Sequence, residues 1–377
     1  MLKRCSKCMI PETHETILYD ENGVCSICRQ YEVKREKIDW KAKEKELLDL
    51  IDQYRGKYAY DCIIPFSGGK DSTFTVYELV KKYGVKPLVV SYDHHFYRPN
   101  TLRNVDRILR KIGADYLKFR TDWHIVKKTM LESFIRKGDF CWHCHSGIFV
   151  YPMQIAVKFK VPLIFWGEPS AEYTSYYAYG EVEEVDEKRF NMWVNLGITA
   201  EDMSGMINVP LRDLECFCYP SLDDLRAIKC RSICLGSYIP WDVKKQSQII
   251  MDELGWEGDL VEGVPPGYSY EKVECMMQGI RDYIKFIKRG YARVSHLTSL
   301  DIRNGRLSRT EAEKLVKKYE GKRPATLDLF LKMVDLKEDE FMRIALSHAV
   351  SPYKHDPNRT ERGQKLYDQD SWDWRDQ

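Results

Sequence analysis

Short apolar runs alternate with amphipathic stretches through the middle of the chain. The runs have the length and the β-branched and aromatic content of buried strands, and the stretches between them have helical periodicity. The expected strands are residues 60–65, 87–92, 115–119, 162–166 and 232–235. The expected helices are residues 72–83, 101–112, 123–136, 146–159 and 222–229. Alternating units of this size predict an α/β fold with a doubly wound, mainly parallel sheet, whose ligands gather at the carboxyl ends of the strands.

The flanking regions follow other patterns. A charged helix with one apolar face is expected at residues 40–54, and the tyrosine-rich, acidic residues 174–215 read as an insertion near the active site. From residue 243 onward the pattern is helical, with a capping-box sequence at Ser308. Further helices are expected at residues 270–289, 326–334 and 337–348. Together these shifts predict three parts: a module at 1–35, the sheet domain at 36–242 and a helical region at 243–377.

Composition and charge narrow the class of protein. Hydrophobic residues make up 44% of the 377 residues, which is enough for a substantial core. The 59 basic and 57 acidic side chains nearly cancel, so nothing marks the chain as a nucleic-acid or membrane-surface binder. No apolar run approaches the roughly 20 residues that span a bilayer, and the first residues lack the apolar core of a signal peptide. We therefore expect a cytoplasmic protein without a membrane partner.

Four cysteines near the amino terminus have the spacing of a metal site. Cys5 and Cys8 form one C-x-x-C pair and Cys25 and Cys28 form a second, with 16 residues between the pairs. Two such pairs can place four thiolates around one zinc ion in a closed, structural site. Disulfide bonds are the alternative, and the expected cytoplasmic location disfavours them. The sequence predicts a structural zinc ribbon.

A glycine loop lies between the first expected strand and the helix that follows it. Its sequence, SGGKDS at residues 67–72, differs from a Walker loop because the glycines are adjacent and aspartate follows the lysine. Backbone N–H groups of the glycines, the serine hydroxyls, the lysine and the positive end of the helix can all meet an anion here. The aspartate can cap the helix or help to hold a magnesium ion.

This loop resembles that of the PP-loop (N-type) ATP pyrophosphatases, which belong to the adenine nucleotide α-hydrolase-like fold. The resemblance implies that ATP is cleaved between its α- and β-phosphates, with Mg²⁺ present and AMP transferred to the substrate. Lys70 and Asp71 would then be catalytic. The residues expected to bind ATP are Phe66, Ser67, Gly68, Gly69, Lys70, Asp71 and Ser72 at the loop, and Tyr92, Asp93, Gly167 and Glu168 at the ends of neighbouring strands.

Further cysteines follow in the second half of the sheet domain. Cys141 and Cys144 form a C-x-x-C pair, and Cys230 comes later in the chain. This arrangement resembles the iron–sulfur tRNA thiolation enzymes, in which such a trio holds a cluster. A second metal site or an iron–sulfur cluster at these three residues is therefore an expectation, with buried free thiols as its alternative. It carries the second functional hypothesis, a PP-loop tRNA sulfurtransferase.

The carboxyl-terminal half carries the more specific resemblance. The segment DIRNGRLSR at residues 301–309, with GSYIPWD at residues 236–242, is similar to the N-acetyl sugar amidotransferases of the WbpG and PseA type. That family implies an ATP-dependent carbon–nitrogen ligase that turns the acetamido group of a surface-polysaccharide sugar, free or nucleotide-linked, into an acetamidino group. It also implies an external ammonia source, a HisH-like glutaminase with a HisF-like subunit.

Three residues are candidates for contact with the sugar. Tyr173 lies at the start of the tyrosine-rich insertion and could stack on a glycan, although such residues also serve as an aromatic cover over a sheet. Arg293 and Arg303 could pair with a diphosphate or a carboxylate of the substrate, although each could equally be a solvated helix charge. The near-neutral net charge argues against a tRNA substrate.

Overall fold

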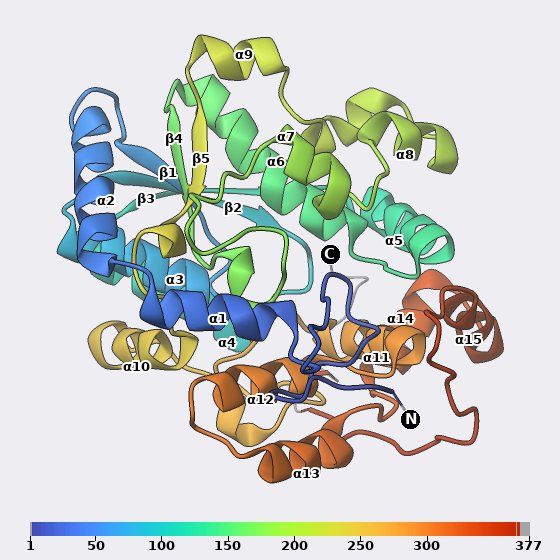
Figure 1. The fold of residues 1–377 in the computed structure, drawn as a ribbon. Coiled ribbons are helices and arrows are strands. Elements are labelled where there is room, and N and C mark those ends of the chain that lie inside the picture. Colours follow the sequence, from blue (N-terminus) through green and yellow to red (C-terminus); the bar gives the residue numbers. More distant parts are fainter. Residues whose placement is uncertain (1, 367, 370–377) are drawn as a thin grey trace.

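Five parallel strands form one sheet in the computed structural model, which describes residues 2–366 and 368–369 (Figure 1). The strand order is β3-β2-β1-β4-β5, so the chain winds outward from β1 in one direction and then returns to the other side of β1. The strands are β1 (Cys62–Pro65), β2 (Pro87–Asp93), β3 (Asp115–Arg120), β4 (Leu163–Trp166) and β5 (Arg231–Cys234). The predicted doubly wound parallel sheet is confirmed.

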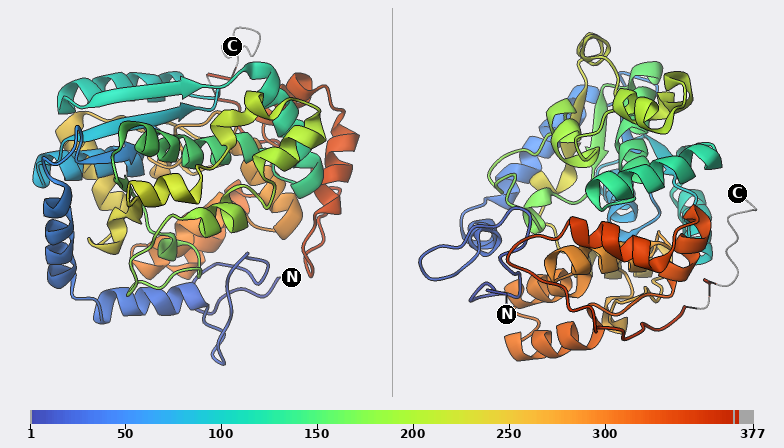
Figure 2. Two further views of the ribbon diagram at one scale, coloured as in Figure 1. Left: turned by 90° about the horizontal axis from the view of Figure 1, so that it is seen from above. Right: turned by 90° about the vertical axis from the view of Figure 1, so that its right-hand side faces the viewer.

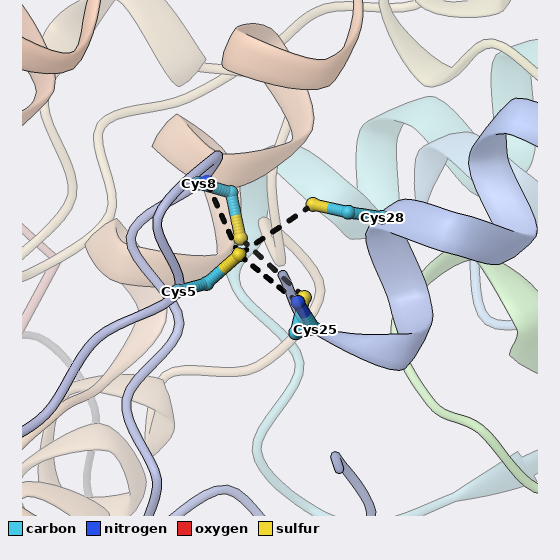
Figure 3. Close-up of side chains that lie close together, drawn as sticks. All are labelled: Cys5, Cys8, Cys25 and Cys28. Atoms are coloured by element: carbon cyan, nitrogen blue, oxygen red, sulfur yellow. Dashed lines mark hydrogen bonds between the residues drawn. The ribbon is translucent and has the colours of Figure 1, made fainter. Parts of the chain in front are cut away.

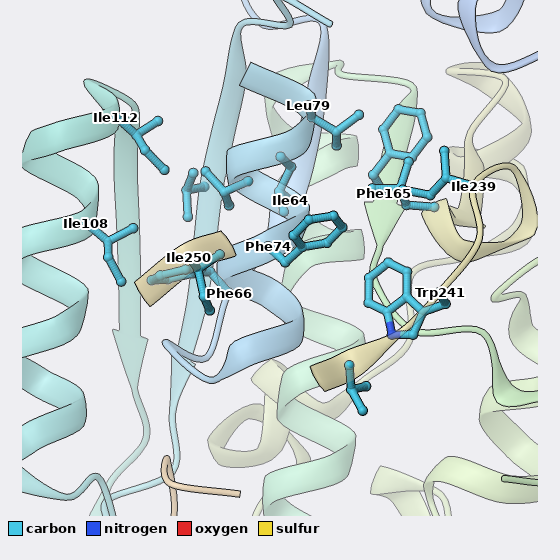
Figure 4. Close-up of a cluster of buried hydrophobic side chains, with 14 of the residues drawn as sticks. Ile64, Phe66, Phe74, Leu79, Ile108, Ile112, Phe165, Ile239, Trp241 and Ile250 are labelled. Atoms are coloured by element: carbon cyan, nitrogen blue, oxygen red, sulfur yellow. The ribbon is translucent and has the colours of Figure 1, made fainter. Parts of the chain in front are cut away.

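Helices cover both faces of this sheet, which explains why its central strands are apolar throughout. Side chains alternate between the faces along each strand. Ile64 packs in one buried cluster with Phe74, and Ile63 packs in another with Met153 (Figure 4 shows the first cluster). The first face carries α3 (Lys70–Tyr77), α4 (Pro99–Ile112) and α10 (Val243–Leu254). The second face carries α6 (Trp142–Phe159) and α9 (Leu222–Ala227).

The helices before and beyond the sheet agree in part with the predicted ranges. The helix expected at residues 40–54 is α2 (Trp40–Tyr54), and α1 (Ser26–Glu36) precedes it. The loop after β3 leads into α5 (Trp123–Lys137). Within the expected insertion the chain forms short elements, including α7 (Glu187–Arg189) and α8 (Ala200–Ile207). Among the described residues, no helix has both the length and the apolar character needed to cross a membrane.

The carboxyl-terminal helices gather on one side of the molecule, and the amino-terminal segment lies alongside them (Figures 1 and 2). They are α11 (Gln278–Arg289), α12 (Arg293–Arg303), α13 (Arg309–Tyr319), α14 (Thr326–Val334) and α15 (Glu338–Ser347). The capping box is confirmed, since the Ser308 hydroxyl accepts from the Glu311 N–H and the Glu311 carboxylate accepts from the Ser308 N–H.

One predicted helix is wrong at its start. The helical pattern extends back to residue 270, but α11 begins only at Gln278. Residues before it are held in another conformation by the loop that follows β2: the Met276 N–H donates to the Phe96 carbonyl at 2.9 Å. Lys272 has a φ of +52°, which a continuous helix cannot contain. Tertiary contacts thus override the local helical preference, and they bring residues 271–274 to the sheet edge.

Candidate nucleotide pocket and cysteine cluster

The glycine loop and the end of β4 meet where the winding of the sheet reverses. Residues 67–72 follow β1, and Gly167 and Glu168 follow β4, which is the neighbour of β1 on the other side. A cavity of about 190 Å³ opens at this point, lined by both segments. In open α/β sheets, ligands bind at the carboxyl ends of strands where the order reverses, so the fold itself singles out this pocket.

The two glycines of the loop allow close approach on both sides. Gly68 has a φ of +77°, and a Cβ there would meet Val105 of α4 at 2.6 Å. Its carbonyl accepts a hydrogen bond of 3.0 Å from the Trp256 indole N–H, which fixes the turn. A Cβ on Gly69 would meet the Glu274 carboxylate at 2.9 Å. Only glycine lets the backbone sit this close to both α4 and the carboxyl-terminal region.

Lys70 is held between two carboxylates. Its ammonium lies 2.8 Å from Asp71 and 2.8 Å from Glu271, and only 5% of its side chain is exposed. Burial disfavours the charged ammonium, but the carboxylates of Asp71 and Glu271 outweigh it and hold the pKa of Lys70 well above its usual value. Lys70 is therefore a buried, permanently charged cation at the amino-terminal end of α3.

The carboxylates of the pocket are crowded. Burial, followed by the charge of Asp71, raises the pKa of Glu168 to about 8. One carboxylate oxygen of Asp71, Oδ1, is buried and has no hydrogen-bond partner within the described structure. Oxygen ligands of this kind beside a phosphate loop are what Mg²⁺ binds, usually together with substrate phosphates. Asp71 and Glu168 thus fit a divalent cation, and they would be its protein ligands.

Most of the residues expected to bind ATP line the pocket. They are Phe66, Ser67, Gly69, Lys70, Asp71, Ser72, Tyr92, Gly167 and Glu168, with Tyr173 from the start of the insertion. Gly68 contributes to the loop but faces α4. Asp93 does not line the cavity; its buried carboxylate accepts from Arg120 at 2.8 Å and lies 3.1 Å from the Lys118 ammonium. Asp93 therefore holds the edge strand β3, and its expected nucleotide contact is not found.

The sequence argument missed several residues of this pocket. Lys272 and Glu274, from the segment before α11, line it, and so does Arg189 from the insertion. Glu271 completes the group through its ion pair with Lys70, and the positive charges of Lys70 and Arg293 overcome its burial and lower its pKa to about 2. Glu271, Lys272 and Glu274 lie about 200 positions from the loop, and their only signal was the unusual charge density of the sequence YEKVE; Arg189 carried no signal.

The two arginines expected at the substrate lie elsewhere. Arg293 is 3.3 Å from Glu271, so it touches the pocket only through that carboxylate. Arg303 is buried beside the amino-terminal cysteines and donates to the Glu172 carbonyl at 3.2 Å. Burial disfavours its charge, yet the thiolates of Cys8 and Cys28 raise the pKa of Arg303. Arg303 does not line this pocket.

The four amino-terminal cysteines converge as their spacing predicts (Figure 3). The sulfur atoms of Cys5, Cys8, Cys25 and Cys28 all lie within 4.8 Å of one another and are buried. Three backbone N–H groups, of Lys7, Cys8 and Cys25, point at the Cys5 sulfur at 3.2–3.4 Å. Four buried thiols with N–H donors aimed at them match a closed tetrahedral zinc site, so this cluster can hold a metal such as zinc.

This cluster is fixed to the carboxyl-terminal helices. The Arg309 guanidinium donates to the carbonyls of Cys5 at 2.6 Å and Cys8 at 3.0 Å. The Met9 N–H donates to the Ser299 hydroxyl at 3.1 Å. Arg309 ends the segment DIRNGRLSR, so part of that segment's role is to clamp the cysteine loops.

The second cysteine trio is not brought together. Cys230 precedes β5 at the amino edge of the sheet, whereas Cys141 and Cys144 begin α6 at the carboxyl edge. Across the described ranges, the only three or more metal-ligating side chains that converge are the amino-terminal cysteines. The thiol that most affects Cys144 is instead Cys275: after burial, its charge is the next cause of the raised pKa of Cys144. The expected metal site at Cys141, Cys144 and Cys230 is therefore wrong as a trio.

Comparison with known families places the carboxyl-terminal region. A family model described as LPS biosynthesis protein WbpG-like, C-terminal domain, matches residues 268–373. These residues are similar to that domain, and we call them the WbpG-like domain. This confirms the resemblance that the DIRNGRLSR segment indicates. The matched range also contains Glu271, Lys272 and Glu274, so the WbpG-like domain builds one wall of the pocket at the glycine loop.

Two individual proteins show weaker similarity. An uncharacterized protein of Methanocaldococcus jannaschii is 27% identical over 146 residues, which is 37% of this chain and 50% of that protein. The chain thus spans about half the length of this curated relative. The solved NMN synthetase from Francisella tularensis is 11% identical and aligns with 62% of this chain and 100% of its own, at a TM-score of 0.29. At that score the likeness supports no statement about fold or function.

Proposed function

We propose that this protein is an ATP-dependent, AMP-forming amidotransferase that converts the acetamido group of a polysaccharide sugar into an acetamidino group. The observation that carries the proposal is the composite pocket. Its glycine loop, SGGKDS, follows β1 at the reversal point of the sheet, and its opposite wall belongs to the WbpG-like domain. A loop suited to nucleotide phosphates and a region similar to a lipopolysaccharide-biosynthesis domain thus line one cavity.

ATP is proposed to bind with its β- and γ-phosphates at the loop. Ser67, Gly69 and Ser72 offer N–H and hydroxyl donors, and Lys70 offers a buried positive charge. The amino-terminal end of α3 points its dipole at the same place. Mg²⁺, held by Asp71 and Glu168, would neutralise phosphate charge when it is bound. Such a site favours pyrophosphate as the leaving group.

The proposed reaction has two steps. The amide oxygen of the N-acetyl group attacks the α-phosphorus of ATP; an O–P bond forms and the bond to the β-phosphate oxygen breaks, releasing pyrophosphate. Ammonia then attacks the imidate carbon and loses one proton, and AMP leaves with the original amide oxygen, so that an N–H group takes the place of that oxygen. The pocket's part is to position the reactants and to stabilise charge, which is how most phosphoryl and adenylyl transfer is accelerated.

The ammonia is proposed to come from a separate glutaminase of the HisH type, acting with a HisF-like subunit. This part of the proposal rests on the resemblance of the WbpG-like domain to the amidotransferase family. The sulfurtransferase alternative loses the observation that favoured it, because Cys230 lies at the opposite edge of the sheet from Cys141 and Cys144.

The test supplies the whole chain with ATP, Mg²⁺, ammonium and a panel of N-acetyl sugars, both free and nucleotide-linked. The proposal predicts that a sugar in the panel drives formation of AMP and gains one NH in place of one oxygen, as mass spectrometry can show. Omission of ammonium should stop the sugar product. Sulfur incorporation into tRNA, with no sugar in the panel converted, would overturn the proposal.

A further inference from the structure

A second charged cavity lies in the WbpG-like region, separate from the nucleotide pocket. It has a volume of about 130 Å³ and lies between α11, the start of α12 and the loop that precedes α6. Figure 1 shows α11 and α12 next to each other in this region. Five cationic side chains line it: Arg281, Lys285, Lys288, Arg289 and Arg293. Nothing in the proposed reaction requires them.

Four of these cations share one face of α11. Residues 281, 285, 288 and 289 are spaced by four, three and one positions, so successive turns of the helix present them together. The apolar side chains of the same helix, Ile280 and Ile287, pack into the core instead. The cationic face is only partly solvated, since Lys285 is 27% exposed and Arg289 is 19% exposed.

The carboxylates at this cavity do not balance its cations. Three line it, and each is already engaged. Glu15 accepts from the Tyr291 hydroxyl at 2.6 Å and lies within 3.4 Å of Lys285 and Arg289. Asp139 accepts from the Cys141 N–H at 2.8 Å, and Asp282 lies 3.6 Å from Arg293.

Two of the cations, Arg281 and Lys288, form no ion pair within 4.0 Å among the described residues. Lys288 donates to the carbonyls of Lys137 and Gly138 at 3.2 and 2.9 Å. Burial disfavours the charge of Arg281, but the nearby Cys141 thiol and Asp139 carboxylate raise its pKa. Burial, with the neighbouring arginine charges, lowers the pKa of Lys285, and burial also lowers the pKa of Lys288. Five cationic and three acidic side chains thus line the cavity.

We propose that this cavity is a binding site for one oxyanion group, a phosphate or a carboxylate. Guanidinium groups such as those of Arg281 and Arg289 present paired N–H donors that match the two oxygens of either group. A volume of about 130 Å³ accommodates one such group, and the rest of the ligand would lie outside the cavity.

The site is joined to the nucleotide pocket by a chain of ion pairs. Arg293, which lines the cavity, lies 3.3 Å from Glu271, and Glu271 lies 2.8 Å from Lys70. An anion bound beside Arg293 therefore shares a cation with the carboxylate that restrains the catalytic lysine. The proposal itself stands on the cavity and does not depend on the proposed reaction.

The test is a calorimetric titration of the whole chain with inorganic phosphate, in a Lys70→Ala background so that the glycine loop contributes least. One site is expected, and Arg281→Gln should weaken it at least about tenfold, as removal of a charge-assisted pair does. Arg281→Lys, which keeps the charge but loses the paired donors, should fall between. Arg212→Gln is the matched control, because Arg212 is 86% exposed and lies elsewhere.

A parallel titration with glucuronate distinguishes a carboxylate source from a phosphate source. Binding of either probe that is weakened by Arg281→Gln supports the site, and the tighter probe names the source. A selenate soak of a crystal should place an anomalous peak between Arg281 and Lys288. The proposal is overturned if neither probe binds, or if Arg281→Gln and Lys288→Gln leave binding unchanged.

Discussion

The glycine loop and the segment that faces it across the pocket, residues 271–274, differ in the chemistry of their side chains. Residues 67–72 are small and offer N–H groups, hydroxyls and one cation, in the rigid connection between a buried strand and a helix. Residues 271–274 include two glutamates, and φ at Lys272 is +52°. The Lys70–Glu271 ion pair joins them. The Glu271 carboxylate thus neutralises the cation of the loop.

This comparison changes how Lys70 is understood. A phosphate loop alone would present a free cation, whereas here Asp71 and Glu271 both hold the ammonium. A triphosphate bound at the loop would have to replace at least one of these carboxylates as the partner of the Lys70 ammonium. Two carboxylates and a triphosphate repel one another too strongly to contact the same ammonium together. Under the proposed function, the WbpG-like domain would thereby take part in nucleotide binding as well as line the pocket.

Loss of the cation should have the largest effect. We expect Lys70→Ala to lower AMP formation by about 100-fold or more, which is typical for removal of one group that stabilises charge in a transition state. Radiolabelled ATP and thin-layer chromatography would measure it. Lys81→Ala, an exposed lysine just beyond α3, should leave the rate unchanged. Retention of AMP formation in Lys70→Ala would mean that the Lys70 cation, which joins the glycine loop to residues 271–274, is not needed for the reaction.

Removal of the facing carboxylate should come next. Glu271→Gln leaves the buried Lys70 and Arg293 with one partner fewer, and we expect a loss of about 3 kcal/mol in the free energy of unfolding at neutral pH. The pKa of Glu271 is lowered to about 2 from 4.5, so its contribution is complete above 4.5 and is lost as the pH falls toward 2. The difference between wild type and variant in urea unfolding should therefore shrink in acid.

The control for this experiment is Glu253→Gln, because Glu253 is an exposed carboxylate of α10. That substitution should change the unfolding free energy by no more than about 0.5 kcal/mol. If both variants unfold alike at neutral pH, Glu271 does not stabilise the contact between the glycine loop and residues 271–274.

Glu168 should give a smaller effect of opposite sign. Burial and Asp71 raise its pKa from 4.5 to about 8, so the folded protein holds a proton there that the unfolded chain releases. Its contribution to stability therefore falls as the pH rises from 4.5 to about 8. Glu168→Gln should remove that decline, as thermal unfolding across this range would show. An unchanged pH profile would indicate that Glu168 is not crowded by Asp71.

The smallest effect is expected at Ser308, where a substitution should change stability but not activity. Ser308→Ala removes the hydroxyl that caps α13, which should cost about 1 kcal/mol of stability. Ser308 does not line the nucleotide pocket, so the rate of AMP formation should not change. A rate loss as large as that of Glu271→Gln would show that general loosening of the WbpG-like domain, rather than the Lys70–Glu271 contact, explains both results.

Much of the fold and of the candidate site could be predicted from local sequence patterns. The buried strands can be recognised as apolar runs in the sequence because helices cover both faces of the sheet. The glycine loop could be placed because it follows β1 directly. The four amino-terminal cysteines needed only their own spacing. The contact of Glu271 with Lys70 could not be predicted in this way, since it joins residues about 200 positions apart through the fold.

The errors have the same physical origin. Residues 270–277 have helical periodicity, but the Met276–Phe96 hydrogen bond holds them in another shape. Cys230 and Cys275 are both isolated cysteines in the sequence, and only the direction of the strands shows that Cys230 lies at the wrong edge of the sheet. Spacing predicts a site when its ligands are local, and it fails when the sheet decides which distant residues meet.

The most direct test of the composite pocket follows the fate of α-labelled ATP with Mg²⁺, ammonium and the panel of N-acetyl sugars. The wild-type chain should produce labelled AMP and no ADP. AMP formation should fall sharply in Lys70→Ala and also in Lys272→Ala, whose side chain comes from the WbpG-like domain. Labelled ADP as the product, or full activity in Lys272→Ala, would contradict the account.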